Sequence, residues 1–101
     1  MIRHILLIKF IDSAEPFEID NLRLLFESIP KKISGVMSVQ WGLNDSPEQL
    51  NKGYTHAVWM TFVNDAARQN YLPHPEHEAL KKVFSPLLED IIVFDYQLSS
   101  D

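Results

Sequence analysis

The chain has 101 residues, no cysteine, and nine Lys and Arg against fourteen Asp and Glu, which gives a formal net charge of −5. A chain of this length has room for one domain, because it is too short to form two separate hydrophobic cores. The acidic balance, with no basic stripe and no Gly-rich phosphate loop, argues against nucleic acid and acidic membrane surfaces as partners. Without cysteine, disulfides and thiolate sites are excluded, and we expect a cytoplasmic protein stabilised by its core or by oligomerisation.

Alternating apolar residues at the start of the chain predict a first strand over Ile2–Ile11. The even-numbered residues of this strand share one face, which is wholly apolar apart from His4. Because Arg3, His4 and Lys9 interrupt the apolar run and no small-residue cleavage site follows, we expect neither a signal peptide nor a membrane span.

A helix is predicted from Pro16 to Ile29, because apolar residues recur there at spacings of three and four. We expect Pro30 to end this helix, since proline cannot continue the hydrogen-bonding pattern. The residues of the apolar stripe are Ile19, Leu22, Leu25, Phe26 and Ile29.

Three more strands are predicted, over Gly35–Leu43, Tyr54–Val63 and Ile91–Leu98, and a long polar loop separates the first two. A second helix begins at Asn64 and must be interrupted after Tyr71 by Pro73. Proline is favoured at the first helical position, so Pro75 restarts the helix, which then runs to about Ser85.

The resulting order β-α-β-β-α-β predicts an α+β, ferredoxin-like domain over residues 1–101, with helices on one face of an antiparallel sheet. The other face would carry an apolar patch too large to leave in water, so we expect a homodimer that packs sheet against sheet. The residues expected on that face, or their neighbours, are Ile5, Leu7, Ile11, Met37, Val39, Trp41, Trp59, Ile92, Phe94 and Tyr96.

Histidines supply most of the candidate chemistry. In the strand order 4-1-3-2 we expect the first and third strands to be parallel, which would place His4 and His56 at the same end. The last strand is antiparallel to the first, so Asp95 should lie beside His4 and fix its tautomer. The alternative is a purely structural role, in which each strand histidine is a hydrogen-bonded core residue and Asp95 simply pairs with His4.

The interrupted helix adds Tyr71, His74 and His77. The positive end of the restarted helix favours a neutral imidazole at His77, and hence a proton acceptor. Tyr71 could donate a hydrogen bond to a substrate carbonyl, or could belong to the core. His74 fits a helix-start residue better than an active group, and a metal site of His56, His74 and His77 has only weak support from its spacing.

Several short motifs together resemble the stress-responsive A/B barrel (Dabb) family. They are the strand that begins at His4, Trp41-Gly42, Gly53-Tyr54-Thr55-His56, Tyr71-Leu72-Pro73-His74-Pro75-Glu76-His77 and Phe94-Asp95-Tyr96. The resemblance covers essentially the whole chain, and the order and spacing of the motifs make the combination specific. The resemblance implies a dimeric α+β barrel in which each subunit keeps a pocket between its sheet and its helices.

The resemblance also implies residue roles, taken from a plant polyketide cyclase of this family that closes a ring by an intramolecular aldol reaction without a cofactor. His77 matches its general base and Tyr71 the hydrogen-bond partner of that base. His4, His56 and Asp95 match supporting polar residues of the pocket. One departure concerns the first helix, where Phe26 stands at the position of a pocket tyrosine in the cyclase.

The leading interpretation is a cofactor-free dimer that binds a small carbonyl or polyketide-like compound and does acid–base chemistry with His77. The alternative is a non-catalytic stress-response or ligand-binding dimer that uses the same residues. A cofactor-free monooxygenase on a similar dimeric barrel is a third class, which the motifs favour less. No metal is expected, and the identity of the ligand does not follow from the sequence.

Overall fold

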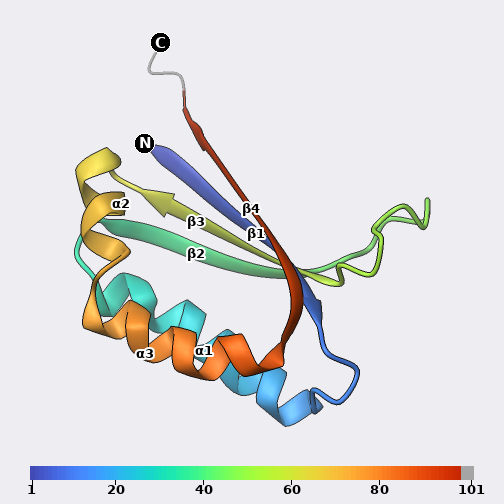
Figure 1. Cartoon of the computed structure of the whole chain (residues 1–101). Helices are drawn as coiled ribbons and strands as arrows, with labels where there is room; N and C mark the ends of the chain where they lie inside the picture. The colour runs from blue at the N-terminus through green and yellow to red at the C-terminus, as the bar shows by residue number, and fades with distance from the viewer. Residues whose placement is uncertain (99–101) are drawn as a thin grey trace.

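Four strands form one antiparallel sheet in the computed structural model, which describes residues 1–98. The central strands are β1 (Ile2–Phe10) and β3 (His56–Phe62), and the edge strands are β2 (Val36–Leu43) and β4 (Leu88–Gln97). The order β2-β3-β1-β4 is the expected ferredoxin-like arrangement. Figure 1 shows that the start of β1 and the end of β4 lie side by side, where the amide of Leu98 donates to the carbonyl of Met1 at 2.9 Å.

Helices cover one face of the sheet. Helices α1 (Pro16–Lys32) and α3 (Pro75–Phe84) lie next to each other beneath it, and the short α2 (Asp65–Tyr71) lies at one end (Figure 1). A turn of 3-10 helix, η1 (Ser85–Leu87), leads from α3 into β4. Within residues 1–98, none of the helices is both long enough and apolar enough to cross a membrane.

Helix α1 does not end at Pro30, as predicted, but continues to Lys32. A proline in the last turn removes a single N–H donor, and the amide of Ile33 still donates to the carbonyl of Ile29 at 2.9 Å. At its other end the helix is fixed by a capping box, in which the side chains of Glu15 and Glu18 accept from each other's backbone amides. The break between α2 and α3, in contrast, lies where Pro73 and Pro75 predicted it.

The predicted parallel pairing of the first and third strands is wrong. Strand β3 is antiparallel to β1, with His4 opposite Met60 and Ile8 opposite His56. The crossover through α1 returns the chain so that β2 runs in the same direction as β1, and β3 then enters between them in the opposite direction. His4 and His56 therefore lie toward opposite ends of the sheet.

Strand alternation divides the sheet into a buried helix-side face and an outer face. The core on the helix side consists of side chains that are almost fully buried, and the largest of them are Tyr71, Phe26, Phe62, Ile8, Leu22, Ile33, Met60 and Val58. The outer face is apolar as expected, and its large side chains remain partly exposed: Leu7, Trp59, Ile92, Phe94 and Tyr96.

Two of the residues expected on the outer face lie on the helix side instead. Val39 and Trp41 pack against the core, opposite Met60 and Val58 of β3. The register of β2 shifts between Val36 and Ser38, which inserts one extra residue and reverses the alternation that follows.

Gly35, which directly precedes β2, offers a test of how closely the chain packs against α2. Its φ of +90° is a conformation that side-chain-bearing residues rarely adopt, and an added Cβ would lie 2.5 Å from the Cβ of Ala67. We expect Gly35→Ala to lower the free energy of unfolding by roughly 1–3 kcal/mol, measured by chemical denaturation. Gly42→Ala is the matched control, because nothing lies within 4 Å of an added Cβ there. Equal stability of the two variants would contradict this packing.

Candidate active site

A cavity of about 320 Å³ lies between the sheet and α3, and we call it the helix-side cavity. Its walls are mostly apolar, and three of its polar residues come from the start of β1 and from the two sides of the break between α2 and α3: His4, Tyr71 and His77. The lining residues are His4, Leu6, Phe26, Tyr71, Leu72, His77, Leu80, Lys81, Phe84, Ser85, Leu88, Ile91 and Val93. A mostly apolar pocket with a few convergent polar groups is the usual form of a small-molecule site.

His77 lies in the first turn of α3, and its ring is oriented by the helix break. Its Nδ1 is 2.8 Å from the carbonyl oxygen of Leu72. Because a carbonyl oxygen can only accept, Nδ1 must carry a proton, and in the neutral ring Nε2 is then a proton acceptor. His77 lines the helix-side cavity, so the polar lining of the cavity includes an imidazole whose Nε2 can accept a proton.

The surroundings of His77 favour the neutral ring. Burial is the main cause that lowers the pKa of His77 below 6.5, and the positive charge of Lys81, one turn later on α3, lowers it further. The Leu72 carbonyl and Glu78 act in the opposite direction without reversing the shift. At neutral pH the imidazole is thus unprotonated at Nε2.

Tyr71 packs directly against His77, with 4.3 Å between the ring centroids. The residue is only 2% exposed, yet within residues 1–98 its hydroxyl is neither fully enclosed nor hydrogen-bonded to another group. Burial raises the pKa of Tyr71, so the hydroxyl keeps its proton and remains a donor. The last residue of α2 therefore places a neutral hydrogen-bond donor beside the base.

His4 and Asp95 meet as predicted, across the antiparallel pair β1–β4. The Nδ1 of His4 is 2.6 Å from Oδ1 of Asp95, and the His4 ring lies edge-on to Tyr71 with 6.3 Å between centroids. The sequence did not reveal Arg68, whose guanidinium donates to Oδ2 of Asp95 at 3.1 Å. Asp65 and Arg68 stand three residues apart on a helix, a spacing typical of exposed ion pairs, so the sequence gives no sign of the contact with Asp95.

His56 does not join this cluster, which corrects the predicted grouping of His4, His56 and Asp95. It lies toward the other end of the sheet, 5.0 Å from the ring of Phe10 and 5.4 Å from the ring of Trp41. Its Nδ1 is 2.7 Å from the hydroxyl of Thr55. Burial lowers the pKa of His56, but the side chain is not part of the helix-side cavity.

His74 serves as the N-cap of α3, where its Nδ1 accepts from the amide of Glu76 at 3.1 Å. This is the helix-start role that the sequence favoured. His56, His74 and His77 are not gathered into one group, and residues 1–98 hold no cluster of three or more acidic, histidine or cysteine side chains suited to a metal.

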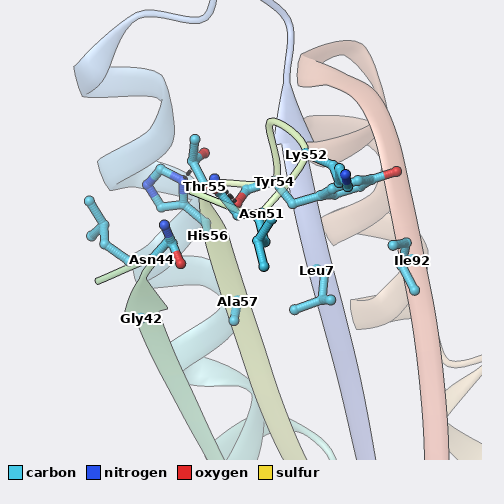
Figure 2. A pocket seen from close by; sticks show the side chains of 12 residues that line it. Leu7, Gly42, Asn44, Asn51, Lys52, Tyr54, Thr55, His56, Ala57 and Ile92 are labelled. Carbon is cyan, nitrogen blue, oxygen red and sulfur yellow. Dashed lines mark hydrogen bonds between the residues drawn. The ribbon is translucent and has the colours of Figure 1, made fainter. Parts of the chain in front are cut away.

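A second hollow of about 370 Å³ lies on the outer face of the sheet, and we call it the outer-face pocket. Figure 2 shows Leu7, Ala57 and Ile92 side by side on β1, β3 and β4 as its floor, with the loop that carries Asn51 to Thr55 above them. The loop is held across the sheet by the hydroxyl of Tyr54, which donates to Asp90. This pocket contains neither His77 nor Tyr71.

Comparison with known proteins gives consistent matches over nearly the whole chain. Residues 2–98 match the model of the stress responsive A/B barrel domain, Dabb. The stress-response A/B barrel domain-containing protein HS1 of Arabidopsis thaliana is 31% identical over 99 residues, which are 98% of this chain and 91% of HS1. Olivetolic acid cyclase of Cannabis sativa is 26% identical over 95 residues, 94% of each chain.

Solved structures agree with these matches. A hydroxynitrile lyase from Passiflora edulis superposes with a TM-score of 0.91 at 24% identity, covering 99% of this chain and 94% of the lyase, a similarity that bears on the fold alone. A dimeric protein of unknown function with a ferredoxin-like fold, from Bacteroides fragilis, gives a TM-score of 0.74 at 28% identity, covering 96% and 95%. On the family match and the shared fold, the chain belongs to the stress responsive A/B barrel domain family.

Proposed function

We propose that this protein binds a small, largely apolar carbonyl compound in the helix-side cavity and moves a proton with His77. The observation that carries the proposal is the bond from Nδ1 of His77 to the carbonyl of Leu72, which leaves Nε2 as an acceptor on a ring that packs against Tyr71. A base and a neutral donor side by side suit the removal of a proton next to a carbonyl group. Both groups belong to the chain, so the step needs no cofactor.

In the proposed step, Nε2 of His77 takes a proton from the carbon next to the carbonyl group. The electron pair of the broken C–H bond moves into the carbonyl, and the resulting enolate oxygen accepts a hydrogen bond from Tyr71. The enolate carbon then attacks a second carbonyl carbon of the same ligand, and His77 returns its proton to the new alkoxide. The relative olivetolic acid cyclase supports chemistry of this general kind.

The apolar walls of the cavity indicate the character of the ligand. Phe26 and Phe84 meet edge-on at 5.2 Å between centroids, and both line the cavity. Since Phe26 carries no hydroxyl, this wall offers hydrophobic contact and no hydrogen bond. We infer that an alkyl or aryl group rests here while the reacting carbonyl lies near Tyr71.

A non-catalytic ligand-binding dimer is the alternative, and it would use the same cavity. The hydrogen bond that fixes the tautomer of His77 favours the catalytic proposal, because simple binding does not require a base in a defined tautomer. The two differ in one measurable respect. Only a catalyst would speed the exchange of protons next to a bound carbonyl group.

We also propose a homodimer formed through the outer face of the sheet. Phe94 on this face is 60% exposed and Ile92 41%, which is costly for apolar side chains on an unpartnered sheet. A second subunit packed against this face would cover these apolar residues and the outer-face pocket.

The catalytic proposal can be tested by deuterium exchange. Apolar ketones and 1,3-diketones are incubated in heavy water, and loss of the proton signal next to the carbonyl is followed by NMR. For a ketone that the wild type accelerates, we expect His77→Ala to lower the catalysed rate by about 10² to 10⁴. His74→Asn is the matched control, since it removes an imidazole but keeps a good N-cap. If the wild type accelerates none of these compounds, or His77→Ala exchanges as fast, His77 is not a base of this kind.

The exchange reaction should also depend on pH in a defined direction. The active form of His77 is unprotonated, and its pKa lies below 6.5, so activity is fully present at neutral pH and is lost as the pH falls through the lowered pKa. A pH–rate profile measures this directly, and titration of the His77 resonances by NMR should give the same midpoint. A midpoint above 6.5 would contradict the burial of this ring.

The dimer can be tested by light scattering at micromolar protein concentration. A stable interface usually buries about 800 Å² per subunit, and a charge in its centre is strongly unfavourable. We therefore expect the wild type to be a dimer and Phe94→Asp to be a monomer or unfolded. Phe17→Asp is the control, because Phe17 is 72% exposed but lies on α1, away from the outer face. A wild-type species of 11.7 kDa alone would refute the dimer.

A further inference from the structure

A continuous series of hydrogen bonds between charged side chains runs from the surface of α2 to His4 in the helix-side cavity. At the surface, Arg68 Nη2 donates to Oδ1 of Asp65 at 2.6 Å, while Gln69 donates to the other oxygen of Asp65, also at 2.6 Å. Farther in, Arg68 Nη1 donates to Oδ2 of Asp95 at 3.1 Å, and Oδ1 of Asp95 accepts from Nδ1 of His4 at 2.6 Å. Three elements, α2, β4 and β1, thus meet through four side chains and one supporting amide.

We propose that Arg68 is a positioning residue of this site. It holds the Asp95 carboxylate by one oxygen so that the other fixes His4 with its proton on Nδ1, leaving Nε2 for the cavity. The inference names a further residue of the proposed active site, and its bearing on turnover rests on the proposed function. Its effect on the geometry of His4 does not.

The positions of these groups explain why a positioning residue is needed. Asp95 lies on the edge strand β4, and its helix-side neighbour on that strand, Val93, is 56% exposed, so packing alone restrains this part of the strand weakly. A carboxylate held at one oxygen only can rotate about its terminal bond. Arg68 supplies the second contact and removes that freedom, in the way that outer groups orient a catalytic imidazole.

Burial strengthens the inner hydrogen bonds of this series, which join Arg68, Asp95 and His4. The side chains of His4 and Asp95 are 11% and 23% exposed, whereas that of Asp65 is 54% exposed. Charges that are partly shielded from water interact more strongly than exposed ones. The contact between Arg68 and Asp95 should therefore matter more to the site than the shorter one between Arg68 and Asp65.

Arg68 also connects the two parts of the polar site, which are the Tyr71–His77 pair and the His4–Asp95 pair. Arg68 and Tyr71 lie three residues apart on α2, and Tyr71 is the donor beside His77. The bond from Arg68 to Asp95 thus ties the helix that carries Tyr71 to the strand that orients His4. A purely structural tie would stabilise this packing without influencing the His4 proton, and the two roles can be separated.

The test follows the His4 ring by NMR in ¹⁵N-histidine-labelled full-length protein, without any ligand. Long-range ¹⁵N–¹H correlations report which ring nitrogen carries the proton, and exchange with water reports how firmly it is held. In Arg68→Leu we expect exchange of the Nδ1 proton to accelerate about tenfold or more, because an Asp95 carboxylate free to rotate holds it less firmly. Arg68→Lys should restore part of the protection, since an ammonium reaches one carboxylate without the planar fork.

Arg23→Leu is the matched control, because Arg23 forms an exposed pair with Glu27 on α1 at 3.2 Å, outside the cavity. It should leave the His4 signal unchanged. If Arg68→Leu is folded but its His4 exchange and tautomer equal those of the wild type, Arg68 is only a structural tie and the inference fails. If that variant does not fold, Arg68→Gln is read by the same criterion. If the His4 signal changes in Arg68→Leu but the wild type accelerates exchange of no ketone, the positioning role is retained and the proposed function is rejected.

Discussion

The site depends on what happens to one carbonyl group where the chain breaks between α2 and α3. In an uninterrupted helix the carbonyl of Leu72 would accept from the amide of Glu76. Here the prolines stop the helix, and the ring of His74 takes the Glu76 amide as a cap. The Leu72 carbonyl is left for Nδ1 of His77, at 2.8 Å. The two histidines thus have complementary roles. His74 caps the start of α3, and His77 is oriented by the Leu72 carbonyl, which has lost its helical amide partner.

Much of this arrangement could be predicted from the sequence, and the exceptions have physical reasons. Pro73 and Pro75 fix the break locally, and an antiparallel β1–β4 pair suffices to bring Asp95 to His4. The misplacement of His56 came from one wrong strand direction, which no local pattern of residues reveals. Trp41 was assigned to the wrong face because a bulge inserts one residue, and every side chain beyond it then changes face.

Arg68 was missed for a different reason. Its neighbour Asp65 gives it an obvious partner within α2, and pairs of that spacing are common on exposed helices. Nothing in the helix itself indicates that the guanidinium also reaches a strand twenty-seven residues later in the chain. Long side chains with several donors can satisfy two partners at once, so a complete local pair does not exhaust what an arginine contacts in the fold.

Under the proposed function, the burial that favours the neutral ring of His77 would also couple its charge to occupancy of the cavity. Partial burial already lowers the pKa of His77, and an apolar ligand that displaces water from the ring would disfavour the protonated form further. By linkage, the unprotonated protein must then bind such a ligand more tightly than the protonated one. Occupancy and the unprotonated state of His77 would therefore reinforce each other, and in the proposed reaction the apolar walls around Phe26 and Phe84 would favour proton transfer as well as binding.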